Sequence, residues 1–245
     1  MLDRGVDINL TDTARLDDGF NLYPGGTDSS LHLLNNVAAE GNIDLFDHLV
    51  GRGADVSLCT ALHSASACQD ADMSITMVRH LLDKYHMDIN RDNDDFRNFF
   101  HMASDKGTPL CSAILNRNLP VVIELLKRGA SPEDPHGYPV SYAMKEDGFL
   151  PAVEPLLQAG ADPTSALVRA VGYHNLNAAE MCLQSGADPK TALHKVLERE
   201  KARIERRGGA DDSGMSKREI RAVQKTETMI EWLRRTIDGD ADALS

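Results

Sequence analysis

Two carboxylates, three aromatic rings and one imidazole fall close together in the segment 91–107: Asp94, Asp95, Phe96, Phe99, Phe100 and His101. An imidazole and a carboxylate can exchange a proton near neutral pH, so His101 with Asp94 or Asp95 is a candidate acid–base pair. Tyr142 and Tyr173 are the phenols that could complete such a site. The spacing does not require catalysis, because the chain has no GxSxG motif, no GxxxxGK(S/T) phosphate loop and no GxGxxG after a strand.

The three phenylalanines of this segment allow two interpretations. Each buried Phe side chain contributes about 1.5–3 kcal/mol to folding, so the rings could form a local core that orders the segment. Long loops in compact folds are usually functional or disordered, so the rings could instead roof a binding groove. We expect one or two rings to be buried and one to be exposed.

The rest of the chain is built on a short motif that recurs six times, as RGVDI, RGADV, YHMDI, RGASP, AGADP and SGADP. Each copy after the first follows an apolar segment with helical spacing. Glycine just after such a segment caps a helix, because it enters the left-handed conformation without a Cβ penalty. His86 takes the glycine position once, which predicts a strained and weaker cap there.

A second motif precedes most of these caps and reads TALHSA, TPLCSA, YPVSYA, SALVRA and TALHKV. Its first residue is a hydroxyl residue in four copies: Thr60, Thr108, Ser165 and Thr191. A hydroxyl there can accept a hydrogen bond from an early backbone N–H of a helix, so we expect these residues to be N-caps. The repeating unit is therefore helix, tight turn, helix, glycine cap.

With both motifs in place, the chain resembles the ankyrin-repeat family, whose signature is T-P-L-H-x-A. TALHSA at Thr60, TPLCSA at Thr108 and the two GADP caps carry the resemblance. It covers residues 1–207 and implies an all-α solenoid of about six helix-turn-helix units with irregular long finger loops and a partial first repeat. The uneven spacing resembles the divergent arrays of filamentous fungi. The family's signature histidine is structural, which is the role expected of His63 and His194.

Departures from the regular repeat define the expected organisation. Inserts at 10–31 and 91–107 replace two finger loops, and no finger precedes Ser165 or Thr191. Residues 208–215 read as a linker. Residues 216–238 then predict an amphipathic C-terminal capping helix, because Ser216 and Glu219 form a capping box ahead of apolar residues at helical spacing.

The resemblance also implies where a partner would bind. Ankyrin proteins generally contact partners through their fingers and through the exposed residues that end each inner helix. The matching inner-helix positions are Glu40, Cys68, Leu115, Asn116, Lys145 and Glu146. Tyr138 and Tyr173 add aromatic faces with polar tips, which interfaces favour. Phe96, Phe99, Phe100 and His101 occupy the place of a finger.

The composition of the chain indicates which classes of partner are expected. The chain carries 26 Lys and Arg against 38 Asp and Glu, a net charge of −12. Nucleic acid is therefore not an expected partner, whereas a basic protein surface would be attracted. The four cysteines form no CxxC pair, so we expect reduced thiols, no zinc site and a cytoplasmic or nuclear protein. No apolar run approaches the roughly 20 residues that span a membrane, so no membrane association is expected.

Together these patterns predict a non-catalytic protein-interaction or adaptor module that needs no cofactor. The alternative is a small-molecule-binding protein, or an unusual enzyme of isomerase or cyclase type, with a pocket roofed by the insert 91–107. An enclosed cavity of about 300 Å³ or more beside Phe99 would favour that alternative.

Overall fold

The computed structural model describes residues 8–9, 33–92, 107–133, 138–145, 148–206 and 217–239. All the regular structure in these ranges is helical, as the resemblance implied. The chain divides into two compact units, 1–139 and 140–245, which are treated separately below. Several residues singled out in the sequence lie outside the described ranges: Asp94, Asp95, Phe96, Phe99, Phe100, His101 and Glu146.

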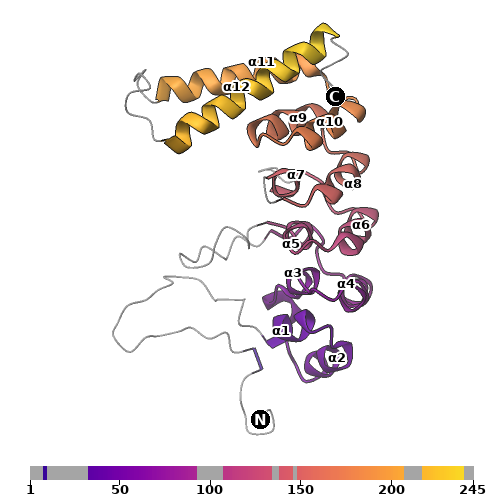
Figure 1. Ribbon diagram of the computed structural model, residues 1–245. Coiled ribbons are helices and arrows are strands. Elements are labelled where there is room, and N and C mark those ends of the chain that lie inside the picture. The colour runs from indigo at the N-terminus through magenta and orange to yellow at the C-terminus, as the bar shows by residue number, and fades with distance from the viewer. Residues whose placement is uncertain are drawn as a thin grey trace, which may run out of the picture. The chain divides into compact units, whose positions relative to one another are not determined.

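Unit 1 contains three successive pairs of helices (Figure 1). The pairs are α1 (Leu33–Ala39) with α2 (Ile43–Gly51), α3 (Ala61–Ser66) with α4 (Ala71–Tyr85), and α5 (Pro109–Leu115) with α6 (Leu119–Lys127). The first helices of the pairs pack on one another in the order α1, α3, α5 and form an inner layer. In the outer layer, α4 packs against α6. A single 3₁₀ turn, η3 (Val56–Leu58), precedes α3.

Unit 2 begins with the same pairing and ends in much longer helices. Its elements are α7 (Tyr138–Met144), which crosses the boundary between the units, the 3₁₀ turn η4 (Leu150–Ala152), α8 (Val153–Gln158), α9 (Pro163–Gly172), α10 (Leu176–Gln184), α11 (Pro189–Arg206) and α12 (Lys217–Asp238). Helix α9 packs on α10 and α11, and α12 lies against both α11 and α9 (Figure 1). Sequence analysis placed the capping helix at 216–238, and α12 occupies nearly the same residues.

Small residues allow the inner helices to approach closely. Ala65 and Ala113 in unit 1, and Ala143 and Ala170 in unit 2, have no solvent-exposed surface. Larger apolar side chains fill the space around them. The most fully buried of these are Leu34, Phe46, Met77, Leu81, Leu110, Ile114 and Leu125 in unit 1, and Met144, Leu156, Leu167 and Leu233 in unit 2.

The helix caps follow the glycine pattern. Gly53, Gly129, Gly160 and Gly186 all have positive φ, between 89° and 104°. His86 is also left-handed, with φ 51°, and its N–H donates to the carbonyl oxygen of Leu81. The predicted cap at residue 86 is thus confirmed, and its side chain carries the strain that glycine avoids.

The prediction of hydroxyl N-caps located the right helices, but the predicted hydroxyl groups do not make the capping hydrogen bonds. Thr60 and Thr108 do precede α3 and α5, but neither makes a side-chain capping bond. The prediction for Ser165 and Thr191 is wrong in position as well. Aspartates take that role, because Asp162 accepts from the N–H groups of Thr164 and Ser165, and Asp188 from those of Lys190 and Thr191. A carboxylate is a stronger acceptor than a hydroxyl at a helix N-terminus.

The turn inside three of the helix pairs, α1–α2, α5–α6 and α9–α10, shares one feature. Gly41, Arg117 and His174 are left-handed, with φ between 57° and 65°, and an asparagine follows each of them. The side-chain oxygens of Asn42, Asn118 and Asn175 accept from the N–H of Leu45, Val121 and Ala178, respectively. This closes the first turn of the second helix in both units.

One hydrogen bond, which we call the cap-to-cap bond, recurs between consecutive repeats. A side chain four residues after the cap position of one motif copy accepts from the backbone N–H two residues after the cap position of the next copy. The three examples are Asn9 with Asp55 (2.8 Å), Asn90 with Ser131 (2.7 Å), and Thr164 with Asp188 (3.0 Å). Because the third example lies in unit 2, the same repeat geometry operates in both units.

Candidate functional site

The predicted contact positions of unit 1 gather at one edge of the inner layer. Glu40, Cys68, Leu115 and Asn116 follow or end α1, α3 and α5, which stack side by side. We call these four residues the inner-helix row. Glu40 and Asn116 are exposed, while Cys68 and Leu115 are half-buried. The row therefore offers polar side chains to solvent above a fully packed layer.

Hydrogen bonds hold the backbone beneath this row in place. The side-chain amide of Asn118 donates to the carbonyl oxygen of Cys68 in the preceding repeat, at 3.1 Å. The side-chain amide of Asn116 donates to the carbonyl oxygen of Ser112. The row is thus tied to the stacked helices, which reduces the ordering cost that a partner would meet on binding.

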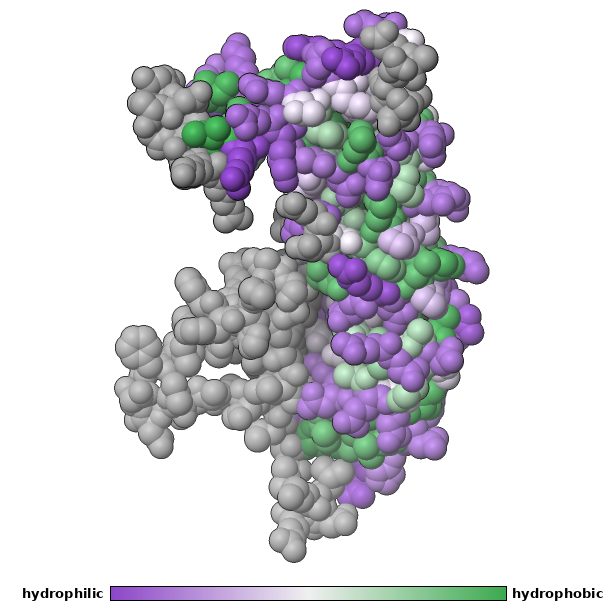
Figure 2. All heavy atoms as spheres, in the orientation of Figure 1, coloured by the Kyte–Doolittle hydropathy of each residue, from purple (hydrophilic) through white to green (hydrophobic). Residues whose placement is uncertain are grey.

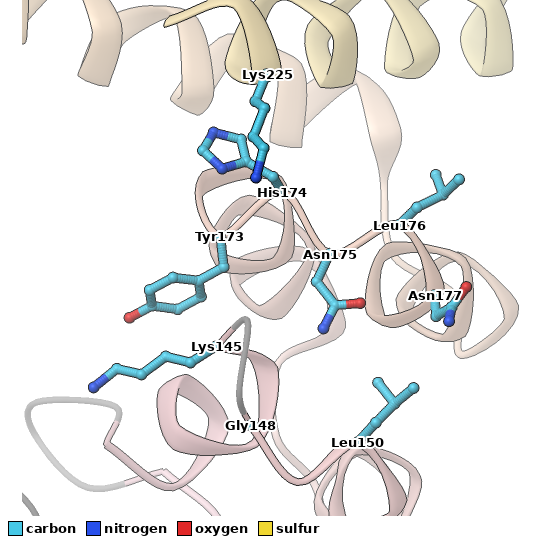
Figure 3. Close-up of a pocket in the computed structure, with 9 residues that line it drawn as sticks. All are labelled: Lys145, Gly148, Leu150, Tyr173, His174, Asn175, Leu176, Asn177 and Lys225. Atoms are coloured by element: carbon cyan, nitrogen blue, oxygen red, sulfur yellow. The ribbon is translucent and has the colours of Figure 1, made fainter. Parts of the chain in front are cut away.

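In unit 2 the corresponding positions line a cavity of about 410 Å³ (Figure 3). The lining residues are Lys145, Gly148, Leu150, Tyr173, His174, Asn175, Leu176, Asn177 and Lys225. We call this cavity the unit 2 recess. Lys145 and Tyr173 were predicted as contact residues, and their side chains extend toward the same side in Figure 3. Lys225 of α12 was not predicted, because only the packing of α12 on α9 brings it near the repeat.

The walls of the unit 2 recess are fixed by side-chain hydrogen bonds. Nε2 of His174 donates to the hydroxyl oxygen of Thr226 on α12, at 2.9 Å. The side-chain amide of Asn175 donates to the carbonyl oxygen of Met144 at the end of α7, at 3.1 Å. These two bonds set the positions of α7, α9 and α12 around the opening.

Two further tyrosines were candidates. Tyr142 is only 6% exposed, and the Lys145 ammonium lies 4.6 Å from the centre of its ring. The Tyr142 side chain is buried, and its ring makes a cation–π contact with the Lys145 ammonium. Tyr138 begins α7, but its side chain lies outside the described residues.

His63 has the structural role expected of it. Its ring is buried, and Nε2 donates to the carbonyl oxygen of Gly107, where the chain returns from the insert 91–107. Burial lowers the pKa of His63 to about 4, so the imidazole is neutral at physiological pH. At the other end of the insert, Arg91 donates to the carbonyl oxygens of Ser57 and Cys59. His194 differs, because it is exposed and, among the described residues, pairs with Glu198 on its own helix, at 3.4 Å.

The comparison with known families now decides the identity of the central repeats. The family model for ankyrin repeats, in three copies, matches residues 34–136. Residues 34–136 are ankyrin repeats. No curated protein matches the chain. No described helix is long and apolar enough to cross a membrane.

The ankyrin repeats of unit 1 are joined on their outer side by two clusters that sequence analysis missed. In the first, Asp47 of α2 accepts from His80, Lys84 and Tyr85 of α4, at 2.6–2.7 Å. Partial burial raises the pKa of Asp47, but hydrogen bonds from Lys84, Tyr85 and His80 outweigh it and bring the pKa to about 2.

The second cluster links α4 to α6. Glu124 accepts from Arg79 at 3.0 and 2.8 Å and from Arg128 at 2.7 Å, while Arg128 also binds Asp83. Hydrogen bonds from Arg79 and Arg128 lower the pKa of Glu124 to about 2. One signal could have found it: Glu124 interrupts the apolar run VVIELLK, where an acid needs a partner. Figure 2 shows the resulting mixture of hydrophilic and hydrophobic side chains over α2, α4 and α6.

A smaller cavity of about 220 Å³ lies beside His63, Cys59 and Arg91 in unit 1. Burial raises the pKa of Cys59 to about 11, so its thiol is not a nucleophile at neutral pH. Among the described residues, no group of three or more His, Cys, Asp or Glu could hold a metal ion.

Proposed function

We propose that the chain is a non-catalytic protein-interaction module that binds a protein partner through the inner-helix row and the finger loops. Ankyrin repeats typically mediate protein–protein contacts, and residues 34–136 are such repeats. The observation that carries the proposal is the inner-helix row itself, where Glu40 and Asn116 remain exposed at the ends of closely packed helices. Chain positions 96–101 belong to the proposed finger surface.

We extend the repeat array to residue 207 and assign α12 the role of its cap. The left-handed Gly160 and Gly186 and the cap-to-cap bond between Thr164 and Asp188 support this extension. Solenoid ends need a covering element, because each repeat buries its faces only against neighbours. Leu233 of α12 is fully buried, in keeping with that role.

The partner we propose carries a basic surface, since the chain has a net charge of −12. All four cysteines are thiols rather than disulfides, which suits a reducing compartment such as the cytoplasm or nucleus. The alternative pocket beside Phe99 falls outside the described residues.

The test is affinity capture from the native extract with quantitative mass spectrometry. The row variant combines Glu40→Lys with Asn116→Lys. The control combines Asp44→Lys with Thr76→Lys, which changes the net charge of the chain by the same amount. The control residues are exposed on the outer helices α2 and α4. We expect the row variant to lose captured proteins by about tenfold or more and the control to retain them. Equal capture by both variants would show that the row is not the binding surface.

A further inference from the structure

The second half of α11 exposes apolar side chains at its surface. Helix α11 has 18 residues and α9, on which it packs, has 10, so the last turns of α11 run past the repeat (Figure 1). The buried residues of α11, Ala192 and Val196, both lie in its first half. In the second half, Leu197 is 39% exposed and Ile204 is 58% exposed.

These two side chains lie on one face of α11. Residues seven apart in a helix are two turns apart and nearly in line, and the exposed Lys201 lies between Leu197 and Ile204. Apolar residues at heptad spacing with charged residues beside them are typical of a helix that pairs with another helix. We infer that this face of α11 pairs with the same face of a second copy of the chain, with the two helices antiparallel.

The order of residues along α11 makes this face complementary to itself. The run LEREKARI begins at Leu197 and ends at Ile204. The two-fold axis of an antiparallel pairing then falls between Glu200 and Lys201. Leu197 of one copy lies opposite Ile204 of the other. Lys201 lies opposite Glu200 and within one turn of Glu198 of the other copy.

Charge favours the antiparallel orientation over the parallel one. A parallel pairing in register would place Glu198 beside Glu198 and Lys201 beside Lys201, and like charges in contact oppose association. Glu200 already forms an ion pair with Arg203 of its own helix, at 2.7 Å. Glu198 is exposed, and its contact with His194 is longer, at 3.4 Å. Glu198 is therefore the carboxylate that Lys201 of the second copy would meet.

The pairing should be weak, because about two turns from each helix bury less surface than a stable dimer does. Stable interfaces bury roughly 1,200–2,000 Å² in total. We expect a dissociation constant on the order of 100 μM. A dimer would carry two inner-helix rows, so a partner with two binding segments would be held more tightly than by a single copy. The pairing itself goes beyond the proposed function and does not depend on it.

The first test is sedimentation equilibrium of the full chain at concentrations from about 10 μM to 1 mM. We expect a monomer–dimer equilibrium that Ile204→Glu weakens by about tenfold or more, because the new carboxylate would have to be buried against Leu197. Leu45→Glu is the matched control, since Leu45 on α2 is as exposed as Leu197 and the charge change is the same. Circular dichroism checks that both variants keep their helices.

The second test exchanges the charges. Lys201→Glu makes positions 198 and 201 both acidic, and Glu198→Lys makes them both basic, so each variant alone should dimerise about tenfold more weakly. An equimolar mixture of the two variants should dimerise at least as well as the original chain, because each acid then meets a base. In the original chain, isotope-filtered NMR should show contacts from the Ile204 methyl groups to Leu197 of the other copy.

Four outcomes would overturn the inference. The chain could stay monomeric at about 1 mM, or Ile204→Glu could leave dimerisation unchanged. The mixture of charge variants could associate no better than either variant alone. The Ile204 methyl groups could show contacts to their own chain only. Affinity capture with the row variant is measured separately, so none of these outcomes alters the test of the proposed function.

Discussion

Units 1 and 2 share a repeat geometry but differ in where their ion pairs lie. In the described part of unit 1, ion pairs connect neighbouring repeats, as between Asp47 and Lys84 or between Arg79 and Glu124. In unit 2, ion pairs along α11 and α12 join residues of one helix at i,i+3 or i,i+4 spacing, as between Glu231 and Arg235. The ion-pair clusters of Asp47 and Glu124 therefore link repeats in unit 1, whereas the ion pairs along α11 and α12 lie on the surface of a single helix.

The difference follows from which side chains meet where the helices pack. The outer helices α4 and α6 of unit 1 pack side by side, and their charged residues meet across the contact. In unit 2 the long helices α11 and α12 bury apolar side chains along their shared face, including Val196 and Leu233. Apolar burial does not weaken with salt, whereas exposed ion pairs do.

The largest expected effect tests this contrast directly. Glu124→Ala should lower the free energy of unfolding by about 2 kcal/mol, because it leaves Arg79 and Arg128 without their shared partner. The matched change in unit 2, Glu231→Ala, should cost less than about 0.5 kcal/mol, since that side chain is 54% exposed. Urea unfolding followed by circular dichroism measures the whole chain, and fluorescence of Trp232 reports unit 2 alone.

The contrast between the units also predicts how the free energy of unfolding changes at acidic pH. The pKa of Glu124 is lowered from 4.5 to about 2 in the folded protein. Its stabilising contribution is therefore complete above pH 4.5 and is lost as the pH falls toward 2. Glu124→Gln should flatten this part of the stability curve, while Glu231→Gln should not. Identical acid curves for the two variants would remove the distinction between the units.

A third prediction concerns what the units share. Asn90→Ala in unit 1 and Thr164→Val in unit 2 each remove one cap-to-cap bond, and each should cost about 1 kcal/mol. Similar losses in the two units, measured by urea unfolding, would support one repeat geometry through the array. A loss confined to Asn90→Ala would mean that unit 2 stacks by other means.

The smallest expected effect compares two left-handed histidines. His86→Gly should stabilise the protein by about 0.5–1 kcal/mol, because glycine relieves the strain at φ 51°. His174→Gly relieves similar strain at φ 58° but also removes the hydrogen bond to Thr226, so little or no gain is expected. Thermal melts of the two variants provide the measurement. A gain for His174→Gly equal to that of His86→Gly would show that the bond to Thr226 adds nothing.

Local signals in the sequence predicted much of the fold. Glycine after an apolar segment located the caps at Gly53, Gly129, Gly160 and Gly186, because few other residues adopt a positive φ cheaply. His86 was predicted as the exception for the same reason. The hydroxyl N-caps were placed less well, since neighbouring aspartates compete for the same N–H groups and bind them more strongly.

The candidate site was less predictable, because it depends on contacts between distant segments. Lys145 and Tyr173 were selected from their places in the repeat, but nothing near them in the sequence indicated Lys225. That residue joins the recess only because α12 packs on α9. The Asp47 cluster has the same origin, since its partners lie on a different helix more than 30 residues away. The role of positions 96–101 stays a prediction.

The cap-to-cap bond makes the stacking of repeats independent of the length of chain between them. Asn90 and Ser131 are 41 residues apart in sequence, whereas Thr164 and Asp188 are 24 apart, yet each pair closes with one hydrogen bond. The segment 93–106 lies wholly between Asn90 and Ser131 and supplies neither atom. The array thus offers a grafting position, at which a foreign loop could be exchanged for that segment while the register of the flanking repeats is kept.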